Sequence, residues 1–194
     1  GVMVLEPDFV RRQVEAVLSD IPPRAAKTGA LGSAAVIGEV ARLARNFSFP
    51  LVVDPVMISK HGAPLMGTDA VRILVERLFP LAALVTPNLH EASELAGFPV
   101  TDRKSMEKAL PIIAGMGPKT VLIKGGRLEQ EGLDLLWSEG TVTAYAAPHI
   151  ETPNTHGTGC VFSAAITARL ARGENLAAAV HGAKQFIAEA IRTN

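Results

Sequence analysis

The chain has 194 residues, of which 48% are apolar and 20% charged, and its formal net charge is zero. This composition is typical of a single globular domain and too apolar for disorder, so we expect residues 1–194 to form one domain. The balance of 19 basic and 19 acidic residues argues against nucleic acid as a partner. No apolar run approaches the roughly 18 residues that span a membrane. The single cysteine, Cys160, excludes a disulfide within the chain and favours a reducing, cytoplasmic location.

The first half of the chain alternates helices with short apolar strands. In chain order we expect a helix over 7–20, a strand over 25–28, a helix over 33–44, a strand over 50–54, a loop over 55–68, a helix ending at 79, a strand over 82–85 and a helix over 88–97. Ser33 is the expected cap of the second helix, and Thr68 or Asp69 that of the third. Asn88 is expected to cap the fourth helix, which Gly97 ends.

The second half begins in the same way and then changes. It predicts a helix over 101–114, a buried strand over 120–124, a hairpin with arms at 133–137 and 141–147, and helices over 160–172 and 176–192. Pro111 lies inside the first of these helices, where it is expected to cause a local fault. The alternation of helices with short buried strands predicts a mostly parallel sheet that is covered by helices on both faces.

Polar residues follow three successive predicted strands. Asp54 ends the first, Asn88 and Glu91 follow the second, and Lys124 and Gly126 come at the end of the third. Taken singly, each residue is best explained as a solvent-exposed polar residue at the end of a strand. Together they favour a ligand site at the carboxyl edge of the sheet. Mg²⁺ binds few carboxylates and several waters, so Asp54 and Glu91 are the predicted metal ligands, acting through water.

The segment 154–160, with the sequence NTHGTGC, precedes a long predicted helix. Its glycines let a ligand approach the main chain, and the free amides and dipole of a helix start attract an anion. The alternative is a glycine-rich turn that caps the helix and binds no ligand. The residues expected to form the anion site are Gly157, Thr158, Gly159 and Cys160.

Other phosphate and hydrolase motifs do not fit. The segment lacks the lysine and the spacing of a Walker loop, and Phe162 stands where a dinucleotide-binding loop needs its third glycine. The HEASE sequence at 90–94 differs from the zinc-protease motif because Glu94 replaces the second histidine. No GxSxG nucleophile motif occurs.

An anion loop, a lysine and acids at one edge predict phosphoryl transfer, which depends on charge neutralisation and positioning. Lys124 would hold the transferring phosphate oxygens, and the amides of 157–160 would stabilise the charge that develops on them. Cys160, in the first turn of a helix, is expected to have a lowered pKa and to act as base or nucleophile, although a bound phosphate would oppose this. The alternative is a small buried apolar residue.

Five motifs occur in a diagnostic order: KTGALGS at 27–33, VDPVM at 53–57, TPNLHEA at 86–92, KGG at 124–126 and NTHGTGC at 154–160. With these motifs the chain closely resembles the hydroxymethylpyrimidine and hydroxymethylpyrimidine-phosphate kinases of thiamine biosynthesis, within the ribokinase superfamily. The resemblance covers essentially all 194 residues. It implies a three-layer α/β/α sandwich, here lacking N-terminal strands, and an ATP- and Mg²⁺-dependent kinase that forms a homodimer.

The resemblance also implies roles for individual residues. Cys160 would stand where sugar kinases carry an aspartate base, within an anion hole of residues 157–160. Asn88 and Glu91 would order magnesium and phosphate. The residues implied to contact the ATP phosphates also include Asp54, Lys124, Gly126 and Thr158. Those implied to line the pyrimidine pocket are Gly29, Ala30, Val56 and Cys160, with Ala30 replacing a common methionine and giving a roomier wall.

Family members begin with a strand and a glycine-rich segment whose aspartate grips the pyrimidine, and the present sequence does not include it. We therefore expect the sequence to be a piece of a longer protein that is incomplete at both ends. Two alternatives to the pyrimidine kinase stay open. One is a pyridoxal kinase on the same scaffold, and the other is a truncated homologue that binds ligand without turnover.

Overall fold

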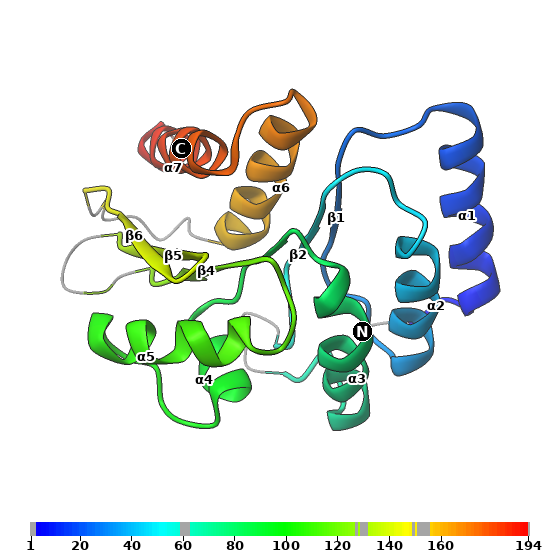
Figure 1. Cartoon of the computed structure of the whole chain (residues 1–194), viewed down its shortest axis with the longest axis horizontal. Coiled ribbons are helices and arrows are strands. Elements are labelled where there is room, and N and C mark those ends of the chain that lie inside the picture. The colour runs from blue at the N-terminus through cyan, green and yellow to red at the C-terminus, as the bar shows by residue number, and fades with distance from the viewer. Residues whose placement is uncertain are drawn as a thin grey trace.

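The computed structural model describes residues 3–58, 63–126, 128, 132–148, 150 and 156–193. Its strands are β1 (Ala26–Thr28), β2 (Leu51–Val53), β3 (Leu84–Val85), β4 (Thr120–Lys124), β5 (Asp134–Ser138) and β6 (Thr141–Tyr145). Its α-helices are α1 (Pro7–Asp20), α2 (Ala34–Ala44), α3 (Thr68–Ile73), α4 (Leu89–Ala96), α5 (Arg103–Ala114), α6 (Thr158–Ala171) and α7 (Leu176–Arg192). Figure 1 shows the strands between two groups of helices.

The strands form one sheet in the order β1-β2-β3-β4-β5-β6. The first four are parallel, and β5 runs antiparallel to both β4 and β6. The β5–β6 hairpin turns at Glu139 and Gly140, whose φ angles of 49° and 82° are those of a tight primed turn. The predicted mostly parallel sheet with one hairpin is therefore confirmed.

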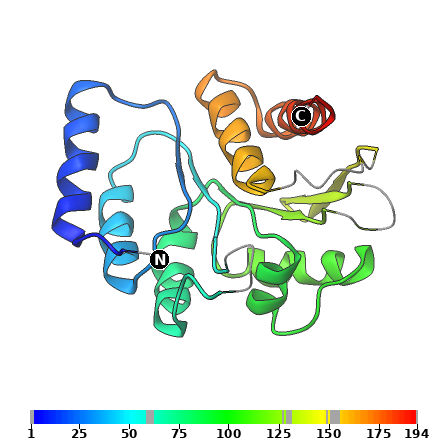
Figure 2. The same cartoon turned by 180° about the vertical axis from the view of Figure 1, so that it is seen from behind.

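The two faces of the sheet are covered by different parts of the chain. The connections between successive parallel strands have the same hand, and each leads to the neighbouring strand, so their helices lie on one face of the sheet. On that face, residues of α2 to α5 share a core with Val53, Val85 and Ile123. Alternate strand residues point to the opposite face, which α6 and α7 cover. The core on that face consists of Val52, Leu84, Leu122, Leu136, Tyr145, Phe162, Ile166, Ala179, Val180 and Ala183. The view from behind in Figure 2 shows the same three layers.

Local capping positions the loops at the edge of the sheet. Ser33 caps α2 by accepting from the amide of Val36, and Asn88 caps α4, as expected. Gly97 ends α4 with a φ of 77°, which confirms the predicted stop. The helix α5 continues through Pro111. No helix in the described ranges is both long enough and apolar enough to cross a membrane.

The third predicted helix differs from the structure in its cap and in its length. Gly67 precedes the first helical residue, Thr68, so neither Thr68 nor Asp69 is the cap. The α-helical part ends at Ile73 and continues as a π-helical turn (Leu74–Leu78) and a 3₁₀ turn (Phe79–Leu81). Pro80 lies in that last turn, and because proline lacks an N–H it cannot continue the α-helical ladder.

Candidate active site

Asp54 lies at the end of β2 and is the centre of a buried polar cluster, with 1% of its surface exposed. Its Oδ1 accepts hydrogen bonds from Lys124 Nζ at 2.7 Å and from Thr86 Oγ1 at 3.3 Å. Its Oδ2 accepts from Ser163 Oγ at 2.9 Å and lies 3.9 Å from Lys27 Nζ. The carboxylate therefore joins the ends of β1, β2 and β4 to helix α6.

The start of α6 faces Lys124. Gly157, just before the helix, has a φ of 80°, a left-handed conformation that favours glycine. Among the described residues, the first backbone hydrogen bond into the helix runs from Val161 to the Gly157 carbonyl at 2.9 Å, so the amides of Gly159 and Cys160 have no acceptor there. A Cβ built on Gly159 would lie 3.4 Å from Lys124 Nζ. The absence of a side chain thus lets helix amides and ammonium face one point.

Glu91 and Asn88 form a capping box at the start of α4. The Asn88 amide donates to Glu91 Oε2 at 2.8 Å, and the Glu91 amide donates to Asn88 Oδ1 at 2.9 Å. Glu91 is 3% exposed, and this burial raises the pKa of its carboxyl to about 7, although Lys124 opposes the shift. A buried carboxyl that titrates near neutrality is common at functional sites.

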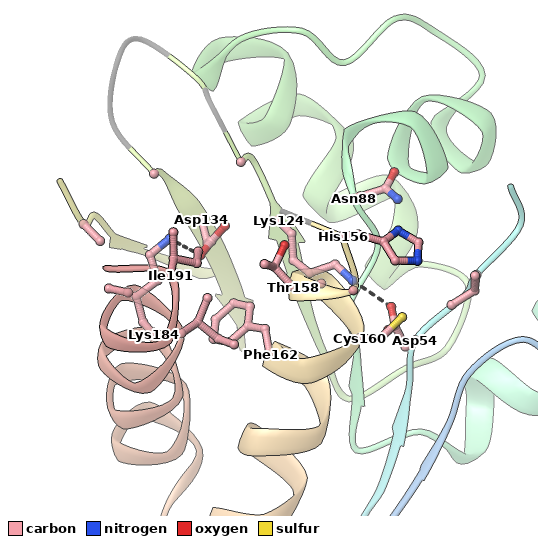
Figure 3. A pocket seen from close by; sticks show the side chains of 18 of the residues that line it. Asp54, Asn88, Lys124, Asp134, His156, Thr158, Cys160, Phe162, Lys184 and Ile191 are labelled. Atoms are coloured by element: carbon pink, nitrogen blue, oxygen red, sulfur yellow. Dashed lines mark hydrogen bonds and ion pairs between the residues drawn. The ribbon is translucent and has the colours of Figure 1, made fainter. Parts of the chain in front are cut away.

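A cavity of about 730 Å³ opens over these residues. Figure 3 shows Asp54, Cys160 and Asn88 at one end, Lys124 and Thr158 in the middle, and Asp134, Lys184 and Phe162 at the other. Apolar side chains from the segment after β6 and from α6 and α7 line this second end: Ala147, Pro148, Ile150, Phe162, Ile187, Ala188 and Ile191. The cavity is therefore polar at the sheet edge and apolar beside α7, which suits a ligand with a charged and a planar part.

Asp134 and Lys184 form a second buried ion pair at the apolar end. Lys184 Nζ donates to Asp134 Oδ2 at 2.5 Å, and the amide of Gly125 donates to Asp134 Oδ1 at 3.1 Å. Burial raises the pKa of Asp134, while Lys184 lowers it. A Cβ on Gly125 would clash with the Leu133 carbonyl oxygen, so only glycine fits at this turn. The pair thus ties α7 to the residue that follows Lys124.

The expected lowered pKa of Cys160 is wrong. Partial desolvation of the thiol raises its pKa, and Asp54 adds to the shift, while Lys27 and Lys124 oppose it. The residue as a whole is exposed, so the alternative of a small buried apolar residue is also wrong. The helix start and the two lysines do not outweigh desolvation and the neighbouring carboxylate. Cys160 is thus a thiol at neutral pH, next to Asp54 as Figure 3 shows.

Most of the predicted site residues line one cavity: Asp54, Val56, Asn88, Glu91, Lys124, Gly126, Gly157, Thr158, Gly159 and Cys160. Gly29 and Ala30 follow β1 but are not among its lining residues. Asn154 and Thr155 of the NTHGTGC segment lie outside the described residues. The sequence did not indicate Asp134, Lys184, Ser163 or the apolar end of the cavity. The spacing of Ser163 three residues after Cys160 was the one available signal, since it places both near one helix face.

A magnesium site remains a prediction. Within the described ranges no group of three or more His, Cys, Asp or Glu side chains is arranged to hold a metal. Asp54 and Glu91 both line the cavity, and this sparse set fits Mg²⁺, which keeps several waters and binds phosphate oxygens.

Comparisons with known proteins agree with this geometry. The family profile described as phosphomethylpyrimidine kinase matches residues 1–194. The thiamine biosynthesis bifunctional protein ThiED of Geobacter sulfurreducens is 43% identical over 99% of this chain, which spans 40% of that protein. The hydroxymethylpyrimidine/phosphomethylpyrimidine kinase of Synechococcus elongatus is 40% identical over 98% of this chain and 73% of its own length.

Solved structures of the same fold are also similar. The pyridoxal kinase of Staphylococcus aureus in complex with AMP-PCP and pyridoxal matches with a TM-score of 0.87 and 36% identity, covering 96% of this chain and 68% of that one. This confirms the ribokinase-like sandwich expected from the motifs. Since the family profile spans the whole sequence and the relatives share about 40% identity, the chain belongs to the phosphomethylpyrimidine kinase family.

Proposed function

We propose that this chain transfers a phosphoryl group from ATP to the hydroxymethyl group of 4-amino-5-hydroxymethyl-2-methylpyrimidine and then to the resulting monophosphate, in thiamine biosynthesis. Membership of a kinase family supports the reaction class. The observation that carries the proposal is the convergence of the start of α6, Lys124 and Asp54 on the polar part of the cavity.

The donor nucleotide fits along the cavity. Its planar base would lie at the apolar end beside Phe162 and Ile187, and its phosphates would reach the start of α6. The amides of Gly159 and Cys160 would donate to oxygens of the transferring group, and the Lys124 ammonium would neutralise the charge developing there. Asp54 holds Lys124 at 2.7 Å and so positions the ammonium for this role.

The acceptor hydroxyl would lie beside Cys160 and Val56, at the polar end of the cavity. Cys160 would accept the hydroxyl proton, which requires the thiolate. Because the pKa of Cys160 is raised above its ordinary value, the thiolate is a minor form at neutral pH, and its fraction grows as the pH rises. We therefore expect the rate with the alcohol to increase with pH and to lose this dependence in Cys160→Ser.

Asp54 and Glu91 would hold Mg²⁺ through water, and the bound ion would supply charge neutralisation for the nucleotide phosphates. The raised pKa of Glu91 means that its carboxyl is partly protonated near neutral pH. Binding of a cation would favour its ionised form. A homodimer, a single domain and a cytoplasmic location stay predictions.

A pyridoxal kinase is the second candidate, because the similar solved structures include a pyridoxal kinase bound to pyridoxal. Ala30 and Cys160 differ from residues common in related kinases, and neither change decides between the substrates. The two candidates are distinguished by the ratio of kcat/KM for pyridoxal to kcat/KM for the pyrimidine, measured on one preparation. A clear preference for pyridoxal would replace the first proposal with the second.

The direct test is ADP formation by the protein with ATP, Mg²⁺ and the pyrimidine alcohol. We expect pyrimidine-dependent turnover, lowered about 100-fold or more by Cys160→Ala if the thiol is the base. Val161→Ala is the matched control, since Val161 is the exposed neighbour on α6. Binding of the pyrimidine in a calorimeter without ADP formation would instead favour a non-catalytic homologue.

A further inference from the structure

Lys27 lies beside Asp54 but is not among the residues that line the cavity, and the roles above do not use it. It pairs in register with Val52, whose side chain lies in the core beneath α6, so Lys27 points to the same face. Its side chain is 21% exposed, and its Nζ lies 3.9 Å from Asp54 Oδ2. Within the described part of the chain, the ammonium has this ion pair but no hydrogen-bond acceptor.

The charges around Asp54 do not balance. Two ammonium groups, on Lys27 and Lys124, share one carboxylate, and Asp54 is held more closely by Lys124 and Ser163. The surplus positive charge in a partly enclosed site therefore attracts an anion.

The position of Lys27 indicates which anion. In the strand order, Lys27 on β1 and Lys124 on β4 stand on opposite sides of Asp54, and the apolar end of the cavity lies beyond β4. A Cβ on Gly29 would be 3.2 Å from Lys27 Nζ, so the ammonium lies over Gly29, which the resemblance places near the acceptor although it does not line the cavity. Lys27 is thus on the side away from the nucleotide base.

We propose that Lys27 binds the phosphate of the phosphorylated acceptor in the second transfer, an inference that rests on the proposed function. An oxygen of the acceptor phosphate forms a bond to the γ-phosphorus of ATP, the bond from that phosphorus to the β–γ bridging oxygen breaks, and ADP leaves with the electron pair. A phosphate monoester is mostly a dianion at neutral pH, so its attacking oxygen has no proton to lose. This step instead requires a cation between the acceptor phosphate and the γ-phosphate of ATP, since both are anions.

The experiment compares kcat and KM for the pyrimidine alcohol and for its monophosphate in the wild type, Lys27→Met and Lys27→Arg. We expect Lys27→Met to lower kcat/KM for the monophosphate about 10- to 150-fold more than for the alcohol, the range set by one hydrogen bond to a charged group. Lys27→Arg should restore most of the wild-type ratio of kcat/KM for the monophosphate to kcat/KM for the alcohol. Cys160→Ser should move the ratio in the opposite direction, because only the alcohol must lose a proton.

Lys119→Met, at an exposed lysine before β4, is the control and should leave the ratio as in the wild type. If Lys27→Met does not fold, Lys27→Gln is measured in its place. Equal losses with both acceptors, or an unchanged ratio, would overturn the inference and assign Lys27 to holding Asp54. A wild type that phosphorylates neither acceptor would instead reject the proposed function, so the two failures are distinct.

Discussion

Ser163 on α6 donates a 2.9 Å hydrogen bond to the carboxylate of Asp54, 109 residues earlier in the chain. Both residues are buried, and the same hydroxyl lies 2.9 Å from the Cys160 carbonyl. The contact fixes the first turns of α6 against the end of β2. Together with the core contacts of Phe162 and Ile166, this side chain therefore positions the α6 amides over Lys124.

Ser163→Ala is expected to lower both stability and activity. Loss of a hydrogen bond to a buried charged group costs about 1.5–3 kcal/mol of the free energy of unfolding. The kcat should fall as well, because α6 loses its link to Asp54. Urea unfolding and steady-state kinetics measure the two effects. The control is Thr120→Val, which removes a hydroxyl hydrogen bond of 2.6 Å to the Ala83 carbonyl at the start of β4, the end of the strand away from Lys124. Equal kcat in both variants would contradict the prediction.

Gly157→Ala tests the start of α6. Gly157 has a φ of 80°, and no atom would contact an added Cβ, so the substitution strains the backbone without a clash. Gly173, at the other end of the helix, has a φ of 86° and is equally open. Each alanine should cost about 1 kcal/mol or somewhat more in unfolding free energy. Only Gly157→Ala should also lower kcat/KM, and similar activities in the two variants would exclude the anion-site role.

The pH dependence of stability should contain a contribution from Glu91. Its pKa rises from 4.5 to about 7 on folding, so the native state binds more protons between these values. The contribution is absent below the unfolded pKa and makes the protein progressively less stable as the pH rises to 7, by at most about 3 kcal/mol. Glu91→Gln should remove this loss, seen in urea unfolding at pH 5 and pH 8. Glu94→Gln, at an exposed position of α4, should keep the wild-type profile.

Lys184→Met is expected to destabilise the protein through Asp134. Both side chains are largely buried, at 14% and 4% exposure, and removing one member of such a pair costs about 3–5 kcal/mol. Because burial raises the pKa of Asp134 and Lys184 lowers it, the variant should regain stability as the pH falls. Arg192→Met breaks an exposed pair on the same helix and should leave the urea midpoint unchanged. An equal response of the two variants would contradict the assigned burial.

The sequence predicted what depends on neighbouring residues. Asn88 and Gly97 marked the ends of α4 because capping and left-handed turns have local signatures. Alternation of apolar runs was enough for the order of strands and helices. The parallel sheet then brought Asp54, Glu91 and Lys124 into one cavity, as their places after strands predicted.

Contacts between residues far apart in the chain could not be predicted from the sequence. The Asp134–Lys184 pair joins residues 50 apart, and nothing local to either indicates the other. The pKa of Cys160 depends on desolvation and on Asp54, so the rule for helix starts pointed in the wrong direction. The roles of Gly29 and Ala30 stay predictions, since neither lines the cavity.

The covering of one sheet face by α6 and α7 alone has a consequence for biosynthesis on the ribosome. Chains emerge from the N-terminus, so the strands β1–β4 are made before the helices that cover half of their surface. Until residue 163 has emerged, Asp54 lacks the hydrogen bond from Ser163, and Val52, Leu84 and Leu122 lack their apolar cover. Nascent chains that end before α6 should therefore be prone to aggregation and unable to retain nucleotide. The ability to bind nucleotide should arise in one late step, when α6 has emerged.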